Sequence, residues 1–181
     1  MGFQELLERK SNIFEHVLYE FQMYFETYFR LRAYCQEEHI DYILKDIVLE
    51  SHAVHLRNLI EFFNRDKNCI TTETIFFGDL DLSFDDTTIK AKQIISKTID
   101  HLTKERYTWI NTNSDLTVRG AFLPSTMFKY YIASRIIKCV DLLLQETDVR
   151  PEFINDLHDL NVQRRLKNLS EICDALRGVL Q

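Results

Sequence analysis

The stretch FEHVLYEFQMYFETYF, residues 14–29, decides the fold class of this chain. Its apolar residues recur at steps of three and four positions, which is typical of one face of an amphipathic helix. No Gly or Pro interrupts the pattern. We expect this first helix to run from about Gln4 to about Glu37, either unbroken or interrupted near Ser11-Asn12.

The same periodicity recurs along the rest of the chain and predicts further long helices. An irregular ordered loop is expected around residues 65–86. We expect four of its apolar side chains to dock on the bundle, namely Phe76, Phe77, Leu80 and Phe84. Only four Gly and two Pro occur in 181 residues, so turns are few and the elements between them are long. The sequence therefore predicts an all-α fold: a single helical-bundle domain over residues 1–181, built as an antiparallel bundle of four to five long helices. The helices expected after the first span about 41–64, 88–109, 124–145 and 152–180, the last either continuous or broken around 159–162.

Composition and missing motifs argue against several classes of protein, including membrane-spanning proteins and nucleotide-binding enzymes. The net charge is −6, which gives no general attraction to nucleic acid or to an anionic membrane. The four cysteines are far apart and form no C-x-x-C pair, as in a reduced cytoplasmic protein. No apolar run approaches the roughly 18 residues that a membrane span requires. No phosphate-binding, dinucleotide-binding or Glu-x-x-His motif is present, so no cofactor is expected.

The second predicted helix carries polar residues within a strongly apolar stretch. Glu50 and Arg57 are seven positions apart and share one face, whereas His55 and Asn58 share a second face. A buried Arg must be paired, because an unpaired buried charge is very costly.

The third predicted helix offers a counterpart in His101, Arg106 and Tyr107. His101 lies close to the apolar stripe of its helix. Arg106 follows five residues later and projects about 140° away, so both side chains can border one groove between helices.

These two segments resemble a family of uncharacterised bacterial helical proteins. The resemblance covers about residues 50–107 and rests on Arg57-Asn58-Leu59-Ile60-x-Phe-Phe and on His-Leu-Thr-x-x-Arg at 101–106. That family in turn is similar to the HEPN superfamily of compact helical bundles, common in defence and toxin–antitoxin systems. Many HEPN proteins are dimeric, metal-independent ribonucleases with an Arg, a polar residue and then a His on one helix. This chain departs from that motif, since Phe62, Phe63 and Asn64 stand where the His belongs.

The resemblance implies an RNA-targeting effector, either a metal-independent ribonuclease or a degenerate relative. In the catalytic form His101 would transfer protons, Arg57 and Arg106 would bind phosphate, and Asn58 would orient the reacting group. Tyr107 would stack on a base. The remaining candidate binding residues are His55 and Glu50.

Two other interpretations stay open at this point. In the first, Arg57 pairs with Glu61 or Glu50 while Asn58 and His101 bond between helices, and the protein is a non-catalytic interaction or scaffold module. In the second, His52 and His55 chelate a metal in a helical-bundle enzyme, helped by His101 or Glu50.

Two further surfaces predict partners. The basic run at residues 163–167, QRRLK, could contact RNA or an acidic partner protein, although such a run is more often a solvated helix face. Aromatic residues almost encircle the first helix, which favours a homodimer. The residues concerned are Phe21, Tyr24, Phe25, Tyr28 and Phe29.

Overall fold

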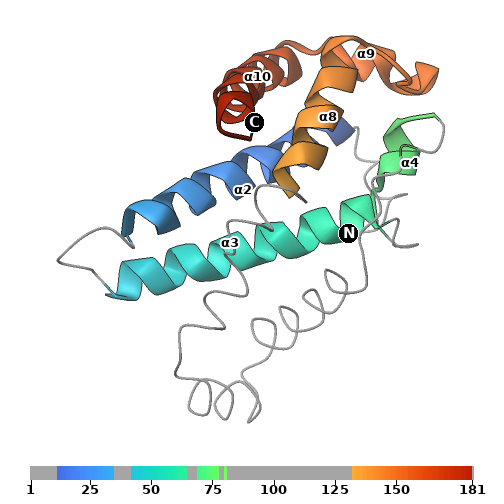
Figure 1. Cartoon of the computed structure of the whole chain (residues 1–181). Helices are drawn as coiled ribbons and strands as arrows, with labels where there is room; N and C mark the ends of the chain where they lie inside the picture. The colour runs from blue at the N-terminus through green and yellow to red at the C-terminus, as the bar shows by residue number, and fades with distance from the viewer. Residues whose placement is uncertain (1–11, 35–41, 65–68, 78–79, 81–131, 181) are drawn as a thin grey trace.

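The computed structural model describes residues 12–34, 42–64, 69–77, 80 and 132–180, and every regular element within them is helical (Figure 1). This confirms the all-α class. Helix α2 (Ile13–Tyr34) lies between α3 (Tyr42–Phe63) on one side and α8 (Ala133–Leu144) with α10 (Leu160–Leu180) on the other. The predicted helix at 88–109 and residues 124–131 of the one at 124–145 lie outside the described residues.

The start of α2 is set by Asn12. Its side-chain oxygen accepts a hydrogen bond from the backbone N–H of Phe14 at 3.0 Å, as an N-cap does. Its side-chain nitrogen donates to the carbonyl of Asp156 at 2.8 Å, which ties this end of the helix to α9 (Ile154–Leu157). The sequence analysis allowed for a break in the first helix near Ser11-Asn12, and α2 begins at that point.

The last predicted helix is broken, as one of the two expectations had it. A short 3₁₀ turn, η2 (Pro151–Phe153), leads into α9, and α10 begins at Leu160. Asp159 separates the two helices because its carboxylate accepts hydrogen bonds from the N–H groups of Asn161 at 2.8 Å and Val162 at 3.3 Å. These contacts satisfy donors that the first turn of α10 leaves unpaired.

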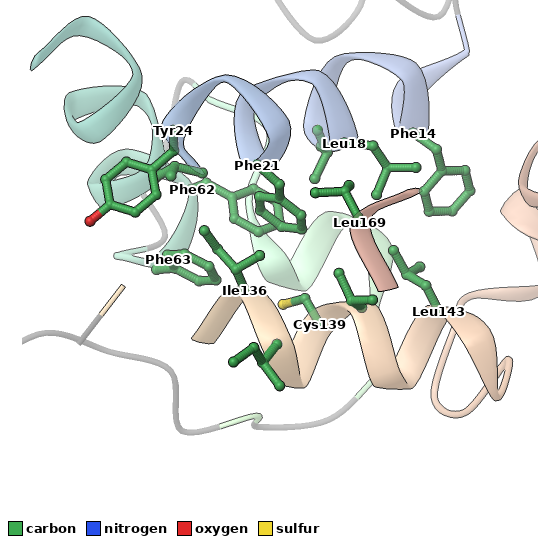
Figure 2. Close-up of a cluster of buried hydrophobic side chains, with 14 of the residues drawn as sticks. Phe14, Leu18, Phe21, Tyr24, Phe62, Phe63, Ile136, Cys139, Leu143 and Leu169 are labelled. Atoms are coloured by element: carbon green, nitrogen blue, oxygen red, sulfur yellow. The ribbon is translucent and has the colours of Figure 1, made fainter. Parts of the chain in front are cut away.

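The core gathers on the inner face of α2. Figure 2 shows side chains of α2 pointing toward α8, from which other apolar side chains point back. Phe21 is fully buried, with its ring 5.8 Å from that of Phe62 and stacked on that of Phe63 at 6.2 Å. The labelled side chains of this cluster are Phe14, Leu18, Phe21, Tyr24, Phe62, Phe63, Ile136, Cys139, Leu143 and Leu169.

The described part of segment 65–86 is partly helical, which corrects the expectation of a wholly irregular loop. Helix α4 (Thr72–Ile75) forms because the side chains of Thr71 and Thr74 cap its first turn. An antiparallel bridge between Phe76 and Val149 then holds the segment against the turn after α8.

Of the apolar anchors expected in this segment, Phe76 is buried and Leu80 packs against the core, as predicted. Phe77 is 46% exposed, so its predicted docking on the bundle is wrong. Its ring lies instead under the guanidinium of Arg150, 4.9 Å from the ring centre. Phe84 lies outside the described residues.

The cysteines behave largely as expected. Cys139 and Cys173 are buried, and burial raises the pKa of both thiols. Cys69 is only half-buried, with its sulfur 3.5 Å from a carboxylate oxygen of Glu61. Cys35 lies outside the described residues. Among the helices that the structure describes, none is long and apolar enough to cross a membrane.

Most of the aromatic side chains that were expected to leave apolar surface on the first helix are buried. Phe21, Tyr24, Phe25 and Tyr28 are buried within the bundle, and only Phe29, at 42%, is exposed. The bundle itself therefore covers four of the five rings on which the expectation of a homodimer rested.

Replacement of Phe21 by Ala is expected to lower the free energy of unfolding by about 3–5 kcal/mol, because it removes a fully buried ring and leaves a cavity. Chemical denaturation measures the change. Phe29→Ala, at an exposed site of the same helix, is the matched control and should cost less than about 1 kcal/mol. Equal losses for the two variants would contradict this packing.

Candidate functional site

The polar face of α3 meets one carboxylate of α2. Glu20 lies opposite His55 and Asn58, with 2.7 Å from its Oε2 to His55 Nδ1 and 3.2 Å from its Oε1 to Asn58 Nδ2. The three-residue spacing predicted that His55 and Asn58 share a face, and both reach the same acceptor. Glu20 itself was not predicted, although a carboxylate directly before the buried Phe21 was a usable signal.

Both oxygens of Glu20 are engaged by α3. The carboxylate accepts from Nδ1–H of His55 and from the amide of Asn58, which fixes the imidazole tautomer. His55 is buried, and the side chain of Glu20 is 25% exposed. Hydrogen bonds to an ionised group in a partly dry setting are stronger than neutral ones. The arrangement therefore holds α2 and α3 in one register.

Arg57 and Glu50 lie away from this contact. Arg57 is two residues past His55, so its side chain leaves α3 about 200° around the helix from the imidazole. It is half-buried, and Glu50 is exposed. The neighbouring Arg57 and Asn58 diverge by about 100°, with only Asn58 directed to Glu20. The other predicted site residues, His101, Arg106 and Tyr107, lie outside the described residues.

The contact extends outward to α10 through Tyr19. The ring of Tyr19 meets that of His55 edge-on at 5.7 Å, and the guanidinium of Arg165 lies 5.8 Å from the centre of the same ring. Arg165 also donates to the side-chain oxygen of Gln22 at 2.6 Å. The residues of the predicted basic run therefore differ in their surroundings. Arg165 packs against α2, whereas Arg164 and Lys167 are exposed.

His52 is buried one turn before His55. Its Nδ1 is 2.9 Å from the hydroxyl of Thr27, and that hydroxyl donates its hydrogen to the carbonyl of Met23 at 2.7 Å. Nδ1 of His52 must therefore carry the ring proton and donate it. Its Nε2 is buried and has no hydrogen-bond partner among the residues that the structure describes.

The ring of His52 stacks on Tyr24 at 4.9 Å, in an environment that disfavours charge. Burial, and secondarily the neighbouring His55, lower the pKa of His52 to about 3. His52 and His55 therefore bond to different residues of α2 rather than pointing together at one ion. The described ranges contain no group of three His, Cys, Asp or Glu residues arranged to hold a metal.

Comparison with known proteins adds no relative. No family model, curated protein or solved structure matches the chain.

A double-mutant cycle tests the contact between Glu20 and His55. We expect Glu20→Ala and His55→Ala each to destabilise the protein, with a coupling free energy of about 1 kcal/mol, because removal of either partner leaves the other unsatisfied. Denaturant titrations of the two single variants and the double variant give this value. Glu26→Ala combined with His55→Ala is the control cycle, and its coupling should be close to zero.

Acid should destabilise the protein through His52. The pKa of this group is about 3 in the folded state against 6.5 in the unfolded chain, so between these values the unfolded state binds more protons. The contribution of neutral His52 to the free energy of unfolding is present above pH 6.5 and is lost as the pH falls toward 3. We expect a loss of about 2 kcal/mol between pH 7 and pH 5. His52→Gln should remove this pH dependence, whereas the exposed His158→Gln should keep it; an unchanged slope in His52→Gln would refute the assignment.

Proposed function

We propose that this protein is a non-catalytic helical interaction module, a relative of the RNA-targeting proteins it resembles in which the polar residues of α3 hold the bundle together. One observation carries the proposal. Both oxygens of Glu20 are bound by His55 and Asn58, two of the residues that the catalytic interpretation requires to face a substrate.

Charge supports this proposal over a phosphate site. A phosphate near the Asn58 amide would lie beside the Glu20 carboxylate, which is 3.2 Å from that amide. Two negative charges at such a distance repel each other strongly in a partly buried setting. The net charge of −6 acts in the same direction over longer distances.

Geometry gives a second line of support. A ribonuclease of the resembled kind uses its Arg and the following polar residue on one substrate. Here Asn58 is directed to α2, while Arg57 leaves the helix about 100° away. One substrate group would have difficulty meeting both side chains at once.

The surface provides residue types that protein partners use. Tyr19 is 42% exposed beside Arg165, and Tyr and Arg are among the residues most enriched at the energetic centres of interfaces. Ile47 of α3 and Leu160 of α10 are exposed as well. A partner protein therefore suits this surface better than RNA does.

Incubation of the purified protein with mixed single-stranded and structured RNA, without metal, tests the proposal. We expect no cleavage by the wild type and none by His101→Ala or Arg57→Ala, with an authentic metal-independent ribonuclease as the positive control. Gel electrophoresis of the RNA gives the readout. Cleavage by the wild type that His101→Ala or Arg57→Ala abolishes, with circular dichroism unchanged, would replace this proposal by the catalytic one.

A further inference from the structure

The chain between α8 and α10 carries a dense negative charge. Residues 146–159 hold five carboxylates and one Arg, so these fourteen residues contribute −4 to the net charge of −6. The N–H of Phe77 donates to the carbonyl of Asp148 at 2.6 Å, which places the end of α4 in the same region (Figure 1). We call residues 72–77 and 144–160 the acidic corner. Its exposed carboxylates belong to Glu73, Glu146, Asp148, Glu152, Asp156 and Asp159.

Half of these carboxylates are free to bind a partner. Glu146 bonds to His158 at 2.7 Å, and Asp159 caps the start of α10. Within the described residues, no hydrogen bond or ion pair engages the other three side chains between positions 146 and 159, namely Asp148, Glu152 and Asp156. A cationic partner therefore gains electrostatic energy here without first breaking an internal ion pair.

Exposed apolar side chains lie in the same corner. The described part of the chain exposes seven large ones, and three of them are here: Phe77 at 46%, Leu144 at 46% and Leu160 at 85%. Leu144 ends α8 two residues before Glu146. Leu160 begins α10 two residues after His158. The hydrogen bond between Glu146 and His158 therefore keeps the two leucines in one region. Apolar groups surrounded by charge are characteristic of protein-binding surfaces.

We propose that the acidic corner binds a basic segment of a partner protein in which Arg alternates with large apolar residues. The free carboxylates accept hydrogen bonds from the guanidinium groups, and the apolar residues cover Leu144 and Leu160. Arg150 already lies over the ring of Phe77, 4.9 Å from its centre, and the exposed part of this ring offers a surface on which an Arg of the partner stacks. The inference rests on the proposed function, since it names the class of partner that the interaction module takes.

Charge decides between this partner and other classes. RNA and anionic membranes are negatively charged, so the acidic corner repels both. An uncharged apolar partner would cover the leucines but would also take carboxylates out of water without pairing them, which is costly. Only a partner that combines cations with apolar side chains satisfies both kinds of group.

A synthetic peptide tests the proposal on the full chain. The probe is a fluorescein-labelled peptide of alternating Leu and Arg pairs, about 16 residues long, or about 24 Å if helical. Fluorescence anisotropy should give a dissociation constant on the order of 10 µM, as for a small interface. The same peptide with Glu in place of Arg should not bind. The peptide with Ser in place of Leu should bind about tenfold more weakly, because it buries no apolar surface.

Matched variants locate the binding surface. Glu152→Lys should weaken binding by about tenfold, whereas Glu171→Lys should change it less than about twofold. Glu171 is exposed as well, but it lies eleven residues beyond Leu160, or about 16 Å along α10. Leu160→Ala should also weaken binding by about tenfold. Phe29→Ala, which removes an exposed ring near the far end of α2, should leave binding unchanged.

These side chains are all exposed, so every variant should fold, and circular dichroism checks this. A wild type that binds no Arg peptide at about 200 µM, well above the expected constant, would overturn the proposal. Equal losses for Glu152→Lys and Glu171→Lys would do the same, because they would show attraction to net charge alone. A chain that neither cleaves RNA nor binds the peptide would end this inference alone. A chain that cleaves RNA and binds the peptide at this corner would end only the proposed function.

Discussion

The ring of Phe21 stacks on Phe63 and meets Phe62 edge-on, and these contacts fix the rotation of α2 about its own axis. The rest of the structure depends on that rotation. Each residue of a helix turns the next side chain by about 100°. Once Phe21 points into the bundle, Glu20 must lie at the edge of the contact with α3. Tyr19, one position earlier still, must lie outside.

The contact between α2 and α3 combines an apolar layer with three hydrogen bonds, which lie at two levels two turns apart along α2. Glu20 meets His55 and Asn58 at one level, and Thr27 meets His52 at the other. A shift of one helix past the other by a single turn would leave these groups buried and unpaired, at a cost typical of unsatisfied polar atoms. The apolar residues alone would tolerate such a shift better. The polar bonds thus select one register among several that hydrophobic burial permits.

The helices could be predicted from sequence because their periodicity is local. The bounds of α3, the end of α8 near Gln145 and the break before Leu160 all follow from apolar spacing and from residues that favour helix ends. The short helix α4 escaped prediction, since four residues are too few to show a period.

The candidate site was predictable only in part. The shared face of His55 and Asn58 follows from their spacing in the sequence. Their acceptor, Glu20, is thirty-five and thirty-eight positions away and becomes apparent only when α2 and α3 are packed together. The placement of Arg165 over Tyr19 likewise depends on how α10 crosses α2, which no local pattern encodes.

The reactivity of the two buried thiols reports local opening of the helical bundle. Alkylating reagents attack the thiolate, and the raised pKa of Cys139 and Cys173 together with their burial makes both unreactive in the closed bundle. Each reacts only during the moments when its helix separates from the core. Because Cys139 belongs to α8 and Cys173 to α10, their separate labelling rates distinguish the detachment of one helix from the opening of both.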